Sequence, residues 1–251
     1  MKHLIIFSLY SCFLNLQIVL AQQVISVEYK EIYAQPQYIS NGTPIFKLII
    51  YPNYSVYYKS DFIKNNLPFF SRNEPDENFK KANDYLFKFF KEQKFLSLSN
   101  KIGNKFFIVS DSIPLVKWKV LKSKPIRYLG LDCYQAQGHF RGRQYTAYFA
   151  PKIRNPDGPF KFCGLPGLII KIVSDDHFKI FQAIKINYHE KEIISVPERF
   201  REKPISFQNY ASLQKMADRK FIQEDKARYQ LKPGETREVY FEYLEKTLEL
   251  D

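Results

Sequence analysis

The sequence has little of several residue types that mark specialised protein classes. Its 251 residues include only 3 Cys, 9 Gly and 14 Pro, which excludes a disulfide-stapled miniprotein and a collagen-like chain. Apart from one run at the N-terminus, no apolar stretch approaches the length of a transmembrane helix. Tryptophan occurs once, yet 23 Phe and 18 Tyr raise the aromatic fraction to 17%. Aromatic side chains favour strands and bury large areas, so we expect a β-rich core.

The N-terminus has the organisation of a secretory signal peptide. Lys2 gives a short basic start, residues 4–20 are mostly apolar and uncharged, and Ala21 offers a small residue for cleavage. We therefore expect a signal peptide over 1–21 that is cleaved after Ala21, export to the periplasm or the exterior, and a single β-rich domain over 22–251. Two alternatives remain. One is a membrane anchor, for which the run is short, and the other is a lipid-modified Cys12, which a bulky residue two positions earlier disfavours.

Negative charge is scarce relative to positive charge. The chain carries 38 Lys and Arg against 26 Asp and Glu, a net charge of +12, and loss of residues 1–21 would remove only one basic residue. The basic residues are scattered, with no arginine-rich block and no nucleic-acid-binding motif, so no nucleic-acid partner is expected. The charge predicts either a solvated cationic face or contact with anionic lipid or polysaccharide.

Alternation of apolar and polar residues, interrupted by turn-forming residues, predicts a mainly antiparallel sheet. The expected fold class is α+β, as a curved sheet or half-barrel with one or two packing helices. One expected hairpin has Arg141 and Gly142 at its tip, and a bulge is expected where Phe181 breaks the phase of Phe178 and Ile180. The expected strands cover residues 23–33, 45–50, 55–59, 105–109, 115–120, 128–139, 143–150, 168–173, 178–188 and 237–242.

Two segments have helical spacing of apolar residues. The first runs from Asp76 to residues 89–90, and its alternative is a mobile insertion, because Lys and Asn are dense there. The second begins after Ser206, which can cap it. The residues expected on its apolar face are Phe207, Tyr210, Leu213, Ala217 and Phe221.

The most specific motif is a hexapeptide rich in glycine and leucine. Its four central residues fit a type II turn, because Pro at the second position presets φ and Gly at the third accepts a positive φ. The β-branched residues that follow favour a strand and argue against a phosphate-binding helix N-terminus. The motif is therefore predicted to be structural, an apolar turn that leads into a core strand. Its residues are Gly164, Leu165, Pro166, Gly167, Leu168 and Ile169.

This hexapeptide and several other segments resemble the GLPGLI family of exported Bacteroidetes proteins. The matching segments follow in family order over residues 117–173, and the departures are Tyr148, where the family often has Trp, and Cys163, a position it does not reserve for cysteine. The resemblance implies export and a β-rich fold. It implies no reaction, because the family offers no catalytic residues to carry over. The matching segments are Lys117-Trp118, 131–136, 140–143, 147–149, 158–160 and 164–169.

Two cysteines remain in the expected mature chain, Cys133 and Cys163. In an oxidising compartment they either form one disulfide or stay apart as small buried hydrophobic residues. A disulfide here would close a loop of about 30 residues and stabilise the fold by roughly 3–4 kcal/mol in the chain-entropy model.

The sequence contains no convincing catalytic or metal-binding set. No two histidines have metal-ligand spacing, and Asp175-Asp176-His177 is typical of a polar hairpin turn, so no metal and no cofactor are expected. The enzymatic alternative is an envelope hydrolase or peptidase accessory built near Cys133 and Cys163. It requires a cleft that joins a histidine to a thiol or a carboxylate. The candidate groups are His139, His177, Cys163, Asp132 and Asp176.

We favour a non-enzymatic binding or carrier module of the cell envelope. Its expected partner is an apolar or anionic ligand, held by a concave aromatic face, or an envelope protein. Arg141 and Arg143 flank the hairpin tip, where alternation would point both the same way and form either a two-arginine anion site or a soluble surface. Trp118 is a further candidate binding residue. A third possibility is a structural partner of an outer-membrane protein that docks through an edge strand.

Overall fold

The structure, a computed structural model, describes residues 24–33, 43–63, 85–99, 102, 105–113 and 115–228. The predicted signal peptide, the predicted strand over 237–242 and residues 76–84 of the predicted first helix lie outside these residues. Within the described ranges, no helix is both long and apolar enough to cross a membrane.

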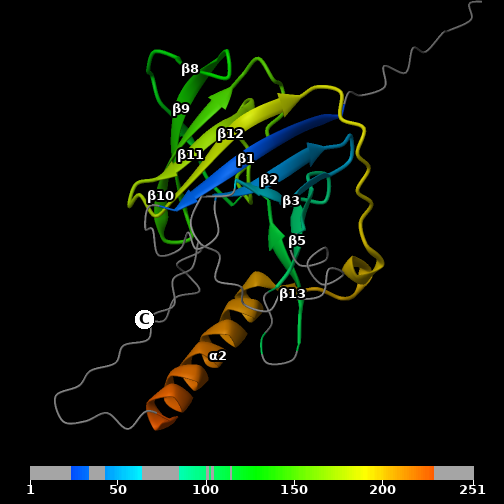
Figure 1. Cartoon of the computed structure of the whole chain (residues 1–251), viewed down its shortest axis with the longest axis vertical. Coiled ribbons are helices and arrows are strands. Elements are labelled where there is room, and N and C mark those ends of the chain that lie inside the picture. Colours follow the sequence, from blue (N-terminus) through cyan, green and yellow to red (C-terminus); the bar gives the residue numbers. More distant parts are fainter. Residues whose placement is uncertain are drawn as a thin grey trace, which may run out of the picture.

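A single large sheet organises the described residues (Figure 1). Its order is β13-β6-β5-β4-β3-β2-β1-β12-β11-β10-β9-β7, with β8 paired to β9 off this path. The sheet is antiparallel except where β13 pairs with β6, and it is not closed. The expectation of a β-rich α+β fold with a mainly antiparallel sheet is confirmed. The strands are β1 (Ile25–Tyr33), β2 (Thr43–Ile50), β3 (Ser55–Ile63), β4 (Leu86–Phe89), β5 (Lys94–Leu98), β6 (Ile108–Ser112), β7 (Lys119–Val120), β8 (Ile126–Tyr128), β9 (Leu131–Phe140), β10 (Arg143–Ala150), β11 (Leu168–Ser174), β12 (Lys179–Asn187) and β13 (Ile205–Ser206).

The β9–β10 hairpin forms as predicted, with a two-residue tip at Arg141 and Gly142. Both tip residues have positive φ, 48° and 84°, which is the backbone of a type I′ turn. This turn matches the right-handed twist of the strands and fixes their register, with Arg143 opposite Phe140. The hairpin places Phe140, Tyr145 and Phe149 in the core.

The bulge in β12 lies three residues from its predicted position. The β1–β12 register shifts between Glu28 and Tyr29, which pair with Lys185 and Ala183, so Ile184 is the extra residue. Phe181 is fully buried and shares its phase with Ala183 and not with Ile180. The prediction failed because Phe178 was counted as part of the strand, whereas β12 begins at Lys179.

The end of the predicted first helix is a strand instead. Leu86–Phe89 is β4, which pairs with β3 and with β5. Leu86 packs into the core on one face of the sheet, while Phe87 packs with Ile49 and Phe200 in a separate cluster. Because both faces are covered, the strand carries consecutive apolar residues, and a spacing rule reads such a run as helical.

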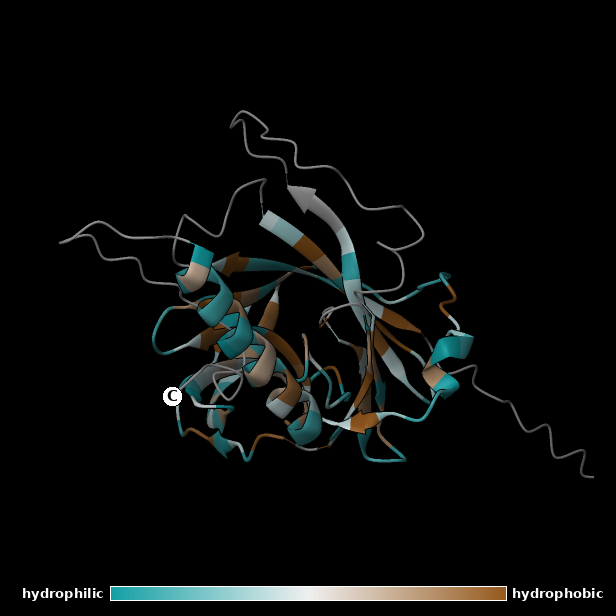
Figure 2. Ribbon diagram, turned by 90° about the horizontal axis from the view of Figure 1, so that it is seen from below, coloured by the Kyte–Doolittle hydropathy of each residue, from teal (hydrophilic) through white to brown (hydrophobic). Residues whose placement is uncertain are grey.

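The second helix is confirmed as α2 (Phe207–Arg228). The backbone N–H of Asn209 donates to Ser206 Oγ over 3.2 Å, which makes Ser206 the predicted N-cap. Only the first turns are anchored by buried apolar residues, Phe207 and Tyr210, whereas Phe221 is 51% exposed. Figure 2 shows the helix as largely hydrophilic, and Figure 1 shows it extending away from the strands below β13.

Candidate functional site

The GLPGLI hexapeptide turns the chain into the core, as predicted, but its turn type is different. The Gly167 N–H donates to the Leu165 carbonyl over 2.8 Å, and the Leu168 N–H donates to Ile153 instead of closing a type II turn. The hydrogen bond between Leu165 and Gly167 closes a three-residue γ-turn centred on Pro166. Gly167 has φ +155°, and a Cβ there would lie 2.4 Å from the Ala150 carbonyl oxygen. The glycine is required by this close approach, and the buried Leu168 then starts β11.

A buried ion pair fixes the loop that precedes the motif. The Lys88 ammonium on β4 donates to Asp157 Oδ1 over 2.6 Å and to the Gly158 carbonyl over 2.5 Å, and both side chains are fully buried. Asp157 Oδ1 also accepts from the Gly158 N–H. Lys88 therefore connects two parts of the chain that are 69 residues apart. Its positive charge is neutralised by Asp157 within the fold.

Cys133 and Cys163 are free and buried thiols, so the structure has the separate-thiol arrangement and not the disulfide. Burial raises the pKa of Cys163 to about 12 and that of Cys133 to about 11. A thiol that stays protonated at neutral pH is a poor nucleophile. Both side chains act as small apolar core residues.

The groups of the enzymatic alternative are not brought together. His139 and His177 are exposed, whereas Cys163 is buried in the core. Among the described residues, neither histidine shares a hydrogen bond with Cys163, and no group of three His, Cys, Asp or Glu is placed to hold a metal ion. Residues 175–177 form the predicted polar turn, in which the Phe178 N–H donates to Asp176 Oδ1 over 3.1 Å.

The two hairpin arginines do not form a joint anion site. Arg141 donates to both carboxylate oxygens of Asp111, at 2.9 and 2.7 Å, and its guanidinium lies over the Phe207 ring. Arg143 is buried and donates to Asp176 over 2.8 Å. Each arginine is engaged by its own carboxylate. Strand alternation, from which the joint site was predicted, does not apply to Arg141, because its backbone is left-handed in the turn.

Trp118 is partly buried and packs against the core. Its indole Nε1–H donates to the Cys163 carbonyl over 2.8 Å, and its ring lies 6.3 Å from that of Phe162. A Cβ at Gly138 would lie 2.4 Å from Val116 Cγ1 and 2.8 Å from the Trp118 ring, so this glycine makes room for both side chains. Trp118 thereby fixes the segment that enters β7.

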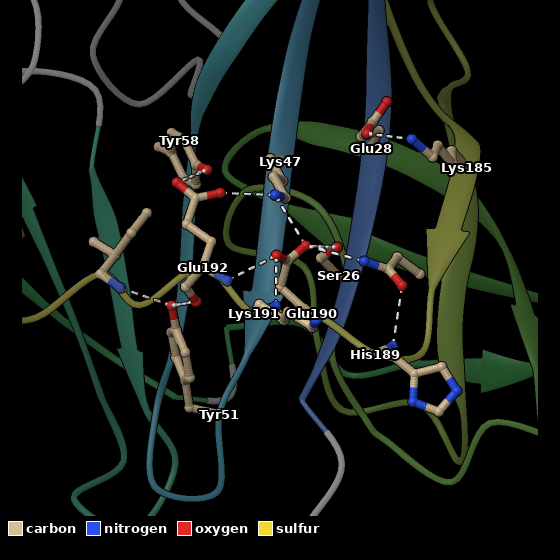
Figure 3. Close-up of polar contacts among 12 residues, drawn as sticks. Ser26, Glu28, Lys47, Tyr51, Tyr58, Lys185, His189, Glu190, Lys191 and Glu192 are labelled. Carbon is tan, nitrogen blue, oxygen red and sulfur yellow. Dashed lines mark hydrogen bonds and ion pairs between the residues drawn. The ribbon is translucent and has the colours of Figure 1, made fainter.

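A polar network on the outer face of the sheet holds the strap, which we define as residues 188–197 (Figure 3). Lys47 contacts Glu190 over 2.9 Å and Glu192 over 2.7 Å. Burial alone would raise the pKa of Glu190, but hydrogen bonds from Ser26, Lys47 and two backbone N–H groups lower it to about 2. Every member of this network is engaged with another, so its evident role is to fasten the strap across β1 to β3.

The feature best suited to contact a partner is the segment of residues 117–130, which we call the cationic edge. It runs along the free side of β9, first as β7 and then as β8. Figure 1 shows β8 at the opposite end of the molecule from α2. No acidic residue occurs between Asp111 and Asp132. The basic residues in that interval are Lys117, Lys119, Lys122, Lys124 and Arg127.

The charges of the cationic edge are exposed and largely unopposed. All five basic residues are exposed, and Arg127 has the nearest carboxylate, Asp132, at 3.9 Å in a pair that is mostly exposed. The side chains of the four lysines form no ion pair or hydrogen bond with any residue that the structure describes. Exposed Val120 and Ile126 lie beside them. The arrangement offers a cationic, partly apolar surface to a partner.

Sequence reasoning missed this surface, although its signal was present. Each lysine was counted as one of many scattered charges, whereas the informative property was the absence of acid over residues 112–131. The lysines come together in space because β7 and β8 both pair with β9. No local sequence pattern predicts that pairing.

Comparison with known proteins does not identify the chain. No family model matches it, and no curated protein matches it. Two solved structures, described as PNGF-II in space groups P21 and C2, align with 76% of this chain at 13% identity, with TM-scores of 0.49 and 0.48. The aligned region covers 33% and 32% of those chains, so this chain spans about a third of their length. A likeness at this level supports no statement about activity.

Proposed function

We propose that the protein is an exported, non-enzymatic binding module of the cell envelope that docks on an anionic surface through its cationic edge. The proposal includes the signal peptide over 1–21, a periplasmic or secreted location, the GLPGLI family resemblance and a half-barrel form of the open sheet. The observation that carries it is the exposed, acid-free charge of residues 117–127. Near an anionic surface each such lysine contributes about 1 kcal/mol.

The packing of the described interior favours a ligand that binds at the surface. It does not favour an apolar ligand enclosed by the sheet. Buried aromatic rings pack against one another, as Tyr145 and Phe162 do at 4.8 Å between centroids. Phe162 also contacts Phe140 at 5.1 Å and Phe181 at 5.7 Å. These rings bury their apolar surface against one another. The cationic edge is therefore a better candidate for ligand contact than the aromatic interior.

Protection of a sheet edge is the competing explanation for the same lysines. Edge strands commonly carry Lys and Pro, which prevent pairing with another chain, and Lys122, Lys124 and Pro125 fit that role. Edge protection needs charge but does not need a ligand. The two explanations therefore differ in whether removal of the lysines weakens binding to an anion.

The test is elution from an immobilised sulfated polymer, dextran sulfate. The edge variant replaces Lys117, Lys119, Lys122 and Lys124 with Gln. The control variant replaces four exposed lysines elsewhere with Gln, so both variants lose the same net charge. The control positions are Lys152, Lys191, Lys203 and Lys226.

The proposal predicts that the edge variant elutes at clearly lower salt than the wild type and that the control elutes close to the wild type, because local charge dominates within a Debye length of about 8–10 Å. Equal shifts for both variants would show that only net charge matters and would overturn the proposal. Failure of the wild-type protein to be retained would also overturn it. Circular dichroism of both variants confirms that each remains folded.

A further inference from the structure

The tip of the β8–β9 hairpin carries a leucine in a position that suits leucine poorly. Tyr128 pairs with Leu131, which leaves Leu129 and Gly130 as a two-residue turn. Their φ values are +50° and +74°, the backbone of a type I′ turn, for which Asn, Asp and Gly are the favoured residues. A branched side chain in the left-handed region is strained, so the fold alone gives no reason for Leu129.

Leu129 is also poorly covered. Its exposed fraction is 49%, and a Cβ built on the neighbouring Gly130 would meet nothing within 4 Å, so the tip stands in open space. Among the described residues, eight large hydrophobic side chains are exposed, and four of them lie within residues 120–134. These four are Val120, Ile126, Leu129 and Tyr134.

Strain and exposure together point to a function at the tip. A strained residue persists where another requirement maintains it. An exposed leucine near lysines gains most from a surface that is anionic outside and apolar beneath. A soluble polyanion would use the lysines and leave Leu129 in water. A bilayer with anionic headgroups would use both.

Resting on the proposed function, we propose that the anionic surface is a phospholipid bilayer and that Leu129 is its insertion residue. The cationic edge lies at the headgroups, and Leu129 enters the boundary of the acyl chains. Val120 and Ile126 pair in register with Ala136 and Cys133, which lie on opposite faces of β9, so Leu129 at the tip is the apolar side chain assigned to insertion.

The first experiment compares Leu129→Asn with the wild type by co-sedimentation with vesicles of equal parts phosphatidylglycerol and phosphatidylcholine. Asn suits the positive φ, so the variant should unfold at the same temperature or higher. We expect vesicle affinity to fall at least about fivefold, because the apolar area that inserts is lost. Retention on dextran sulfate should not change. Undiminished vesicle affinity would overturn the assignment, and the raised or equal thermal midpoint removes misfolding as an explanation.

The second experiment places an environment-sensitive fluorophore on the tip. Leu129→Cys is labelled, and Ile193→Cys serves as the control, since Ile193 is 83% exposed and lies on the strap. We expect a blue shift for the tip label with phosphatidylglycerol-containing vesicles, and none with dextran sulfate or for the control label.

These results separate the two proposals. Retention on dextran sulfate without a blue shift on vesicles would contradict insertion and leave an anionic polymer or an acidic protein as the partner. Absence of binding to both probes would contradict the proposed function itself.

Discussion

Lys88 Nζ lies 2.6 Å from Asp157 Oδ1, and neither side chain is exposed to solvent. This contact joins β4 to the loop that leads into the GLPGLI turn. Lys88→Met leaves Asp157 buried without its cation, which typically costs about 3–5 kcal/mol. We expect a loss of this size in the free energy of unfolding, measured by urea denaturation. Lys88→Met combined with Asp157→Leu should recover much of the loss, and a full loss in the double variant would contradict the account of an uncompensated charge.

The strap predicts a specific acid sensitivity. The pKa of Glu190 is lowered from an ordinary 4.5 to about 2 in the folded chain, so its stabilising contribution is present above about pH 4.5 and is lost as the pH falls toward 2. Glu190→Gln should lower stability at pH 7, by on the order of 2 kcal/mol. It should also flatten the pH dependence of stability between pH 4.5 and 2. Glu224→Gln on α2 is the matched control, because the Glu224 side chain is 57% exposed. A wild-type slope in Glu190→Gln would refute this assignment.

Substitutions at two glycines distinguish the cost of a steric clash from the cost of a strained backbone. Gly167 and Gly130 both have positive φ, but only at Gly167 would a Cβ meet backbone, 2.4 Å from the Ala150 oxygen. Gly167→Ala should therefore destabilise strongly, whereas Gly130→Ala should cost only about 1–2 kcal/mol for its left-handed conformation. Chemical denaturation of both variants measures the difference. Similar losses would contradict the close approach of the motif to Ala150.

The thiols should be unreactive in the native protein. Burial raises the pKa of Cys163 to about 12 and that of Cys133 to about 11, so the thiolate fraction is very small at pH 8. Iodoacetamide at that pH should label neither cysteine until the chain is unfolded with urea, as measured by mass spectrometry of Cys-containing peptides. A reducing agent should leave the thermal midpoint unchanged, and a fall on reduction would instead indicate a disulfide.

Local patterns predicted the elements that have one exposed face. The β9–β10 hairpin and α2 were found because a turn dipeptide and an N-cap residue mark their ends. The strand β4 was misread because Leu86 and Phe87 are buried on opposite faces, which removes the alternation. The type of turn in the motif depended on Ile153, whose carbonyl accepts the Leu168 N–H from another part of the loop.

The candidate site was harder to predict than the fold. Arg141 and Trp118 were recognised as notable side chains, yet both are engaged inside the molecule, by Asp111 and by the Cys163 carbonyl. The lysines of the cationic edge lacked any motif, and only the course of β7 and β8 along one strand brings them together. Which charged residues remain without a partner is a property of tertiary structure.

The central claim is that the cationic edge binds an anionic surface, and its most direct test is the salt dependence of equilibrium binding to soluble dextran sulfate. The slope of log affinity against log salt reports how many cationic groups contact a polyanion. We predict a shallower slope for the variant with Lys117, Lys119, Lys122 and Lys124 replaced by Gln, and a wild-type slope for the control with the four lysines replaced elsewhere. Equal slopes in the two variants would contradict the account.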